Sequence, residues 1–348
     1  MNRNRFRTQK ADLTPLNRPR TPETSMPISR RQMLLASSTL LAPALSRAQD
    51  KPTIRILMGL PPGGGTDSIA RYIAEKLREQ LGQPVIIESR VGVGGRLAAD
   101  ALMNANPDGL TYMIAPNATP TFQTLVFGPQ LKWNIWRDFA PVAGLVSYPL
   151  GMAVNADLGV KNAKEFVQWV KANPGKASFG TPGTGGQNHF LGVQFAKLAG
   201  IDLPMAPYKG TPPMITDLLG GHVPSGISLM DELIKHQRTG KLRVIGIFSD
   251  KRSEMMPDIP TFAEQGFAVS SGDGWTAMWA PAKTPQSEIA RVQQAVQKIL
   301  ANPQVKDFLM TRLAVEPHYR SAEEMAKAQR EELATWEPII KASGFKAE

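Results

Sequence analysis

Cysteine is missing from this 348-residue chain, which excludes disulfide bonds, a lipidated N-terminal cysteine and a thiol nucleophile. Histidine is scarce, and the four that are present lack the spacing of metal ligands: His189, His222, His236 and His318. The sequence also lacks the Gly-x-Ser-x-Gly elbow of serine hydrolases and the Gly-Lys-Ser/Thr ending of a phosphate-binding loop. We therefore expect no catalytic set, no bound metal and no cofactor.

Basic residues outnumber acidic ones, 40 to 30, which gives a formal charge of +10. The excess is concentrated in residues 1–48, which hold nine Lys or Arg and two acidic residues. The rest of the chain has 31 basic and 28 acidic residues and carries about +3. The six Trp and thirteen Phe do not alternate with basic residues, as they do in proteins that bind single-stranded nucleic acid. We expect no nucleic-acid partner.

Residues 1–48 have the features of an export signal. Arg30-Arg31 precede an apolar stretch, and Ser46-Arg47-Ala48 forms a small-x-small cleavage site. The paired arginines favour a twin-arginine signal over a Sec signal. The apolar stretch is interrupted and is shorter than the roughly 20 residues of a membrane span. We expect cleavage after Ala48, a periplasmic location and no membrane insertion, with Met26 as an alternative to Met1 as the first residue.

After this signal, strand-like and helix-like patterns alternate. Short runs rich in β-branched residues predict strands, whereas apolar residues that recur at helical spacing predict helices. The expected elements are strands at 53–59, 85–88 and 110–115, with helices through 69–81 and 96–104. Strands that alternate with helices form a parallel sheet with right-handed crossovers.

A second α/β unit is expected beyond Pro141. Its expected elements are strands at 150–154, 177–180, 223–229 and 242–248, helices at 163–172 and through 191–198, and a short helix that ends at Gly240. After a break at Pro257 and Pro260, one more strand is expected at 275–280, with helices at 286–301, 303–313 and 322–342. Because these last helices outnumber the remaining strands, we expect them to pack against the first unit.

Two glycine-rich turns each follow an expected strand and open an expected helix. They are Leu60-Pro61-Pro62-Gly63-Gly64-Gly65-Thr66-Asp67 and Thr181-Pro182-Gly183-Thr184-Gly185-Gly186-Gln187-Asn188-His189. A strand that leads through glycines into a helix N-terminus directs backbone N–H groups and the positive end of the helix dipole toward one point. The two turns therefore predict two half-sites that hold one small acid between two lobes.

Several side chains near these turns have competing interpretations. We expect Thr66 to cap its helix, and Asp67 to cap the same helix and pair with Arg71 without touching a ligand. His189 lies in the first helical turn and is either a structural donor or a ligand contact. Tyr208 either lies at the rim of the cleft or packs beside a solvated turn.

A set of short motifs, in order along the chain, resembles the Bug-type extracytoplasmic solute receptors of tripartite tricarboxylate transporters. The resemblance spans essentially the whole chain after the signal, and the ordered set is specific although each motif is short. The motifs are Pro62-Gly63-Gly64-Gly65-Thr66-Asp67 with Ala70-Arg71, Asn106-Pro107-Asp108-Gly109-Leu110-Thr111, Phe179-Gly180-Thr181-Pro182-Gly183-Thr184-Gly185, His189, Tyr208-Lys209-Gly210, Gly240-Lys241-Leu242-Arg243, Arg252, Pro257-Asp258-Ile259-Pro260-Thr261, Glu264, Gly266, Trp275 and Ala280-Pro281.

The resemblance implies an α/β fold of the two-lobed periplasmic-binding-protein (Venus-flytrap) type, with a mostly parallel sheet flanked by helices in each lobe. We expect lobe 1 to comprise residues 49–142 and 273–348, and lobe 2 residues 143–272. The lobes would close about two segments near Pro141 and Gly272. The implied protein is a monomer that captures a small carboxylate-bearing solute and passes it to the membrane components of the transporter.

The resemblance places the solute between the two glycine loops, held partly through water. Together with Tyr208, which the residues themselves suggest, the expected ligand-binding residues are Leu60, Pro61, Gly63, Gly64, Gly65, Thr66, Thr181, Gly183, Thr184, Gly185, Gly186 and His189. The chain departs from the family at three places. The family often has an aromatic residue where Leu60 stands, Asn-x-Pro where Ser89-Arg90-Val91 stands, and an acidic residue where Pro224 stands. These departures concern the identity of the solute and leave the expected fold unchanged.

Two other functions compete with solute delivery. A sensing receptor would have the same fold but would present its liganded form to a signalling partner. A periplasmic hydrolase or isomerase would use Asp67 or His189 as a base and would need a nucleophile beside it. Because the sequence shows no such nucleophile, we expect binding without chemistry.

Overall fold

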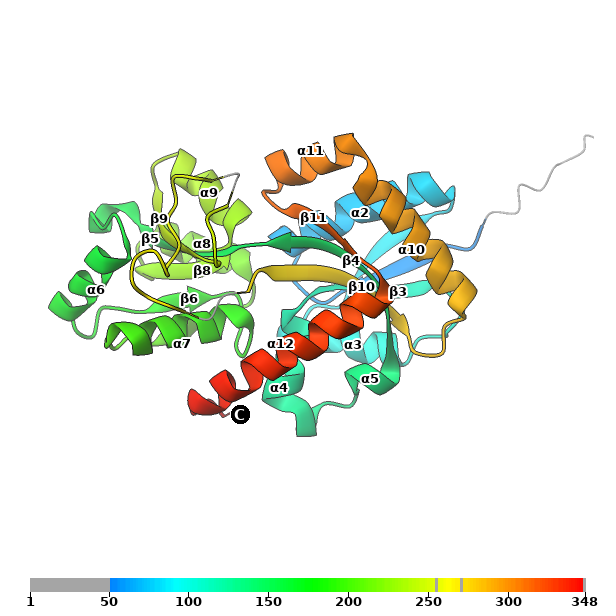
Figure 1. The fold of residues 1–348 in the computed structure, drawn as a ribbon, viewed down its shortest axis with the longest axis horizontal. Coiled ribbons are helices and arrows are strands. Elements are labelled where there is room, and N and C mark those ends of the chain that lie inside the picture. The colour runs from blue at the N-terminus through cyan, green and yellow to red at the C-terminus, as the bar shows by residue number, and fades with distance from the viewer. Residues whose placement is uncertain (1–50, 254–255, 270–271, 347–348) are drawn as a thin grey trace, which may run out of the picture. The chain divides into compact units, whose positions relative to one another are not determined.

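The strands form a six-stranded and a five-stranded sheet in the computed structural model, which describes residues 51–253, 256–269 and 272–346 (Figure 1). The expected export signal and its cleavage site lie outside these residues. The larger sheet has the order β11-β4-β10-β3-β1-β2. Its strands are β1 (Ile54–Met58), β2 (Val85–Ser89), β3 (Thr111–Pro116), β4 (Phe139–Tyr148), β10 (Gly274–Pro281) and β11 (Glu316–Arg320).

The smaller sheet has the order β7-β6-β8-β5-β9. Its strands are β5 (Leu150–Asn155), β6 (Phe179–Thr181), β7 (Met205–Pro207), β8 (Ser225–Leu229) and β9 (Leu242–Phe248). With helices flanking each sheet, this is the expected two-lobed α/β fold (Figure 1).

Both sheets are mixed, so the expectation of mostly parallel sheets is wrong. β1 is parallel to β2 and β3, and β6 is parallel to β7 and β8. In the larger sheet, however, β10 is antiparallel to β3 and β4, and β11 is antiparallel to β4. In the smaller sheet β5 is antiparallel to β8 and β9. β5 and β10 enter from the other sheet at the edge where the parallel strands end, and they must therefore run the opposite way.

The chain passes between the sheets twice. β4 leads through the single residue Pro149 into β5, and β9 leads through residues 249–273 into β10. β4 and β10 pair with each other along the larger sheet. The first crossover therefore lies at Pro149 and not near Pro141, which pairs with Trp279 inside the larger sheet. The second enters β10 directly after Gly272 and Asp273, while the exact limits of the lobes stay a prediction.

Helices flank both sheets, and their apolar spacing explains where they pack. Ile69, Ile73 and Leu77 lie on the buried face of the helix Gly65–Leu81. Ser321 and Glu324 form a capping box at the start of the helix Ala322–Ala342. The helices beside the larger sheet are α2 (Gly65–Leu81), α3 (Arg96–Met103), α4 (Gln123–Phe127), α5 (Ile135–Asp138), α10 (Gln286–Ala301), α11 (Pro303–Arg312) and α12 (Ala322–Ala342). Those beside the smaller sheet are α6 (Ala163–Ala172), α7 (Gln187–Ala199), α8 (Thr211–Leu219) and α9 (Met230–Arg238).

The C-terminal helices pack against the first unit, as expected. α10 and α12 contact β4, and Phe308 of α11 stacks on Tyr72 of α2 with ring centroids 4.1 Å apart. The expected bounds of α6, α10, α12 and β9 coincide with those observed.

Six α-helices and β-strands of the described chain were not expected from the sequence: β4, β7, β11, α4, α5 and α8. β4 is the longest strand of the described chain, but it contains Pro141 and Gly144. Because both residue types are uncommon inside strands, the sequence does not predict it. α8 begins with Thr211-Pro212-Pro213, and proline is compatible with a first helical turn although it ends most helices. The expected apolar face of α7 is correct at Leu191 and Phe195 but wrong at Leu198, which is 53% exposed.

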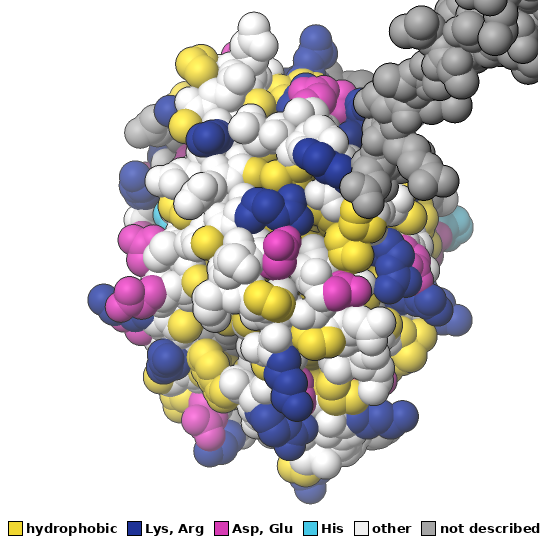
Figure 2. Space-filling model, turned by 90° about the vertical axis from the view of Figure 1, so that its right-hand side faces the viewer, with side chains coloured by type: hydrophobic (Ala, Val, Ile, Leu, Met, Phe, Trp, Pro, Cys, Tyr) yellow, Lys and Arg dark blue, Asp and Glu magenta, His cyan; other side chains and the backbone are white. Residues whose placement is uncertain are grey.

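Charged side chains of both signs are interspersed over the face shown in Figure 2, without a large area of one sign. This distribution agrees with the small net charge of the chain after residue 48. Within the described ranges, none of the helices is long and apolar enough to cross a lipid bilayer.

Gly192 tests the packing of α7 against β6. A Cβ atom at this position would lie 2.2 Å from the Phe179 ring, so we expect Gly192→Ala to lower the free energy of unfolding by about 1–3 kcal/mol through overpacking. Gly128→Ala is the matched control, because its Cβ would meet no atom within 4 Å and its φ of −37° suits any residue. Urea midpoints followed by circular dichroism compare the two variants. Equal midpoints for Gly192→Ala and the wild type would contradict this packing.

Candidate functional site

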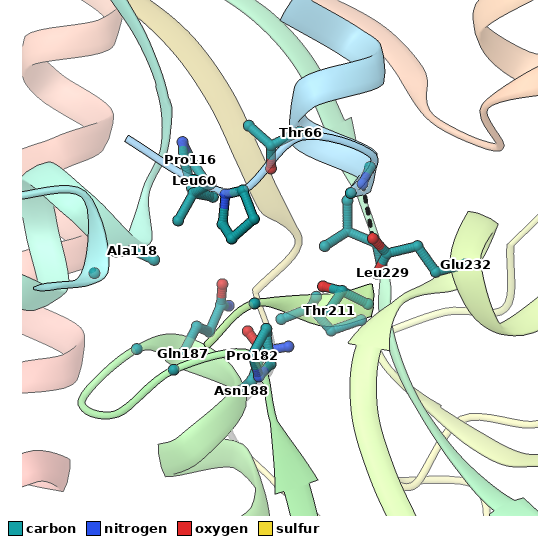
Figure 3. Close-up of a pocket in the computed structure, with 18 of the residues that line it drawn as sticks. Leu60, Thr66, Pro116, Ala118, Pro182, Gln187, Asn188, Thr211, Leu229 and Glu232 are labelled. Atoms are coloured by element: carbon teal, nitrogen blue, oxygen red, sulfur yellow. Dashed lines mark hydrogen bonds between the residues drawn. The ribbon is translucent and has the colours of Figure 1, made fainter. Parts of the chain in front are cut away.

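A pocket lies where the carboxyl ends of strands from the two sheets face each other (Figure 3). Its walls come from the loops after β1 and β3 of the larger sheet and after β6, β7 and β8 of the smaller sheet. Open α/β sheets bind ligands at this edge. Eight of the expected site residues line the pocket: Leu60, Pro61, Gly64, Gly65, Thr66, Gly183, Thr184 and Gly186.

The first glycine loop turns sharply from β1 into α2. Gly63 has φ of +86°, a conformation that favours glycine, and its N–H donates to Asp67 Oδ2 at 3.0 Å. Arg71 Nε donates to the same oxygen at 2.8 Å, which confirms the expected Asp67–Arg71 pair. The cap itself differs from expectation, because the N-cap is Gly64 and neither Thr66 nor Asp67 supplies a side-chain cap. Asp67 orients the loop, and Thr66 is left to line the pocket.

In the second glycine loop, two of the expected residues shape the backbone and do not line the pocket. The buried Thr181 hydroxyl donates to the Gly183 carbonyl at 2.6 Å. The Gly185 N–H donates to His189 Nδ1 at 3.3 Å. Both contacts hold the loop so that Thr184 and Gly186 reach the pocket.

His189 is packed inside the protein and away from the pocket lining. Its ring contacts Phe190 and Phe345, with centroids 4.8 and 4.9 Å away. Burial lowers the pKa of His189 to about 4, so the ring is neutral at physiological pH and accepts the Gly185 N–H. The structural interpretation of this histidine is therefore the one that the geometry supports.

Tyr208 lies beside the pocket and is not part of its lining. It lines an adjoining cavity with Arg96, Phe127 and Lys209, and this cavity shares the walls formed by Leu60, Pro61 and the second glycine loop. Its hydroxyl donates to Asp217 Oδ2 at 2.9 Å. Burial, and to a smaller extent this hydrogen bond, raises the pKa of Tyr208 to about 12. The phenol is thus protonated and already has a partner.

Three of the helices that begin at the pocket have glycine N-caps: Gly64 of α2, Gly186 of α7 and Gly210 of α8. None of these caps uses a side chain to accept a helix N–H. The N-termini of α2 and α7 therefore direct backbone donors toward one space, whereas α8, whose Pro212 and Pro213 have no N–H, adds mainly the positive end of its dipole. This arrangement favours an anionic group.

Side-chain amides that the sequence did not single out complete the wall. Asn117 Nδ2 donates to Gln187 Oε1 at 2.9 Å and to Glu332 Oε1 at 2.5 Å. Gln187 Nε2 donates in turn to the Gly272 carbonyl at 2.6 Å. The network links the end of β3 to the start of α7 and to the second crossover. Gln187 lies inside the glycine-rich turn, whereas nothing in the sequence distinguishes Asn117 from other asparagines.

Glu232 is the other residue that the sequence did not single out. It lies in the first turn of α9, and its Oε1 accepts the N–H of Gly65, the first residue of α2, at 2.7 Å (Figure 3). Its Oε2 accepts from the Ser228 hydroxyl. Burial, together with the neighbouring Asp231, raises the pKa of Glu232 to about 7. An acidic residue just after a buried strand, at the edge where strands end, was the available sequence signal.

Among the described residues, no group of three or more His, Cys, Asp or Glu side chains is arranged to hold a metal ion. The hydroxyl-bearing residues that line the pocket are Thr66, Thr184, Thr211 and Tyr148, and in the described chain no histidine lines it beside them. The geometry supports non-covalent binding of a small polar solute.

Known proteins share both the sequence and the fold. The family described as tripartite tricarboxylate transporter family receptor matches residues 69–345. BugT of Bordetella pertussis is 29% identical over 314 residues, which cover 90% of this chain and 96% of BugT. Two solved structures from Rhodopseudomonas palustris are similar. One of them, a protein with adipate, has a TM-score of 0.80 and is 26% identical. The match covers 84% of this chain and 97% of the chain of that protein. MatC with bound malate has a TM-score of 0.77 at 28% identity, covering 83% and 98%.

Glu232 has a measurable effect on stability because its carboxyl group has a higher pKa when folded, about 7, than the ordinary value of 4.5. The folded state then loses stability as the pH rises from about 5 to about 8, since ionisation is easier in the unfolded chain. We expect Glu232→Gln to remove this loss, which amounts to about 1–3 kcal/mol of the free energy of unfolding near pH 8. Urea unfolding across this range measures the difference from the wild type, with Glu75→Gln on the exposed face of α2 as control. A pH-independent difference would rule out the raised pKa.

Proposed function

This chain belongs to the receptor family of tripartite tricarboxylate transporters and is a solute receptor with a two-lobed α/β fold, and we propose that it captures a small carboxylate-bearing solute in the periplasm. It would deliver that solute to the membrane components of such a transporter. The observation that carries this proposal is the convergence of the glycine-capped N-termini of α2, α7 and α8 on one pocket.

The binding groups in this proposal are backbone N–H donors and threonine hydroxyls. Thr66, Thr184 and Thr211 place hydroxyls in the wall, and glycines at the loops let the backbone approach the solute closely. Of the expected ligand-binding residues, Gly63, Thr181, Gly185 and His189 act by shaping the loops, and Tyr208 lines the adjoining cavity.

Relatives with bound solutes support a small carboxylate. The two similar structures hold adipate and malate, which share carboxylate groups and differ in length and substitution. A pocket that uses backbone donors recognises the carboxylate and leaves the rest of the solute to side chains that vary. Small carboxylates are therefore the first class to test.

Lobe closure is the proposed signal to the transporter. Hydrogen bonds from Asn117 to Gln187 and from Gly65 to Glu232 join the walls contributed by the two sheets. A solute that adds contacts to both walls favours the closed arrangement. The proposal includes two lobes, with the expected boundary at residues 142 and 143 moved to the crossover at Pro149 and the boundary at residues 272 and 273 kept. It also includes a monomeric state, export by a twin-arginine signal in residues 1–48, and no chemical change to the solute.

Solute binding has a direct test. A ligand that binds only the folded state stabilises it by about 2.7 kcal/mol at a hundredfold excess over Kd, so the melting temperature should rise with concentration. Di- and monocarboxylates, amino acids and amides form the screening set, and solution scattering should show a smaller radius of gyration for the liganded form. NMR of the recovered solute after long incubation should show it unchanged. Turnover that disappears in an Asp67 or His189 variant would establish an enzyme instead.

Gly64→Val tests the first half-site. Gly64 has an extended φ of −82° that any residue adopts, and a Cβ there would lie 3.6 Å from Glu232 Oε1 inside the pocket. We expect at least a tenfold loss of solute affinity by calorimetry, equivalent to about 1.4 kcal/mol, with little change in the urea midpoint. Asp67→Asn is the companion variant. It should retain measurable binding, because Asp67 is expected to orient the loop through Gly63 and Arg71 without contacting the solute itself. Wild-type affinity in Gly64→Val would place the solute elsewhere.

A further inference from the structure

A carboxylate of the protein itself lies at one of the two half-sites. Glu232, from the helix after β8, accepts the N–H of Gly65 at 2.7 Å, and Ser228 donates to its other oxygen (Figure 3). Gly65 opens α2, so the positive end of that helix already faces an anion. The Thr211 hydroxyl is a third donor to this carboxylate, which has about four lone-pair positions and so can accept from one more donor, and Glu232 is part of the pocket wall.

The charge of Glu232 is not balanced by a cation. Among the described residues, the pocket wall contains no Lys, Arg or His side chain, and its acidic residues are Asp67 and Glu232. Asp67 is paired with Arg71 at 2.8 Å. The neighbouring Asp231 is paired with Lys235 at 3.3 Å, whereas the groups that hydrogen-bond to Glu232 are the Gly65 N–H and the Ser228 and Thr211 hydroxyls, none of which is charged. A negatively charged group beside Glu232 would therefore meet an uncompensated like charge.

The opposite end of the pocket differs in charge. It is formed by Gly183, Thr184, Gly186 and Asn188 at the N-terminus of α7, where the described wall carries no acidic side chain. An anion at this end meets helix N–H donors and a hydroxyl. The two ends of one pocket thus favour groups of opposite charge.

On the basis of the proposed function, we propose that Glu232 determines the class of solute: a carboxylate that carries a protonated amine at its other end. The carboxylate lies at the α7 end, and the ammonium group lies beside Glu232 and donates hydrogen bonds to it. Dicarboxylates, which would place a second anion beside Glu232, are disfavoured. The acidic side chain makes a zwitterion complementary to a pocket whose helix N-termini alone would suit two anions.

The preference should depend on pH. Burial raises the pKa of Glu232 to about 7, so its charged form dominates near pH 8 and its neutral form near pH 6. The charged and titratable groups around it are Asp231 and Lys235 on α9, Asp67 and Arg71 on α2, and Tyr148 on β4. Burial also raises the pKa of Asp231, so variants of Glu232 are needed to assign the effect to one carboxyl group.

Matched solutes test the proposal by calorimetry on the mature protein. In each pair one carboxylate is exchanged for an aminomethyl group: succinate with 4-aminobutanoate, and adipate with 6-aminohexanoate. Near pH 8 we expect the amino acid of at least one pair to bind the wild type at least tenfold more tightly than its dicarboxylate. Near pH 6 this ratio should shrink, because the protonated Glu232 no longer repels a carboxylate.

Three variants assign the ratio to the charge at this position. Glu232→Gln keeps the size and an acceptor for Gly65 but removes the charge, so the ratio should fall at least tenfold and lose its pH dependence. Glu232→Asp retains the charge and should retain the preference for the amino acid, although with weaker binding. Glu75→Gln on the exposed face of α2 should behave as wild type. A purely structural role for Glu232 would change affinity for both members of a pair equally.

The outcomes separate this proposal from the proposed function. Dicarboxylates that bind the wild type near pH 8 as tightly as their amino partners would overturn the role of Glu232 and leave a carboxylate receptor standing. An unchanged ratio in Glu232→Gln would also overturn it. If no member of either pair and no other carboxylate stabilised the folded protein, both the solute class and the proposed function would be wrong.

Discussion

The two passages of the chain between the sheets are the constraint on which the pocket depends. β4 continues through Pro149 into β5, and the chain returns from β9 into β10. Both passages lie at the edge where the parallel strands end, so β5 and β10 run antiparallel to their neighbours. The ends of β1 and β3 are thereby brought opposite the ends of β6 and β8. Helices that begin after these strands direct their N-termini into the space between them.

The groups that form the pocket reduce the stability of the fold while they prepare it for a ligand. Burial raises the pKa of Glu232 in the pocket wall, and of Glu332, which accepts a hydrogen bond from the wall residue Asn117, to about 7, because a buried carboxylate loses its hydration. Glycine N-caps have no side chain that could accept a helix N–H, and at the start of α2 Glu232 from the other sheet accepts the Gly65 N–H instead. Perturbed acids and helix N-termini that share one cleft are typical of functional sites. Here they belong to the walls that the two sheets contribute to one pocket.

Sequence patterns identified the two glycine loops, because a run of glycines between a strand and a helix can be recognised from residues that are adjacent in the chain. They also identified the Asp67–Arg71 pair, since residues four apart on a helix are neighbours wherever the helix lies. They were less successful with the direction of side chains. Thr181, Gly185 and His189 belong to the right loop, yet they face its interior, and this depends on how Phe345 and Phe190 pack around His189.

The sequence by itself determined the α/β class, most helices, the absence of cysteine chemistry and the two glycine loops, because each follows from local spacing or composition. Tertiary structure alone decided the mixed sheets and the crossover at Pro149, because strand direction depends on which sheet a segment joins. It alone also placed Glu232 on the N-terminus of α2 and Asn117 against Gln187. These partners are 167 and 70 residues apart, and no local pattern connects them. Only the folding of two sheets around one cleft brings their charges and donors within hydrogen-bonding distance.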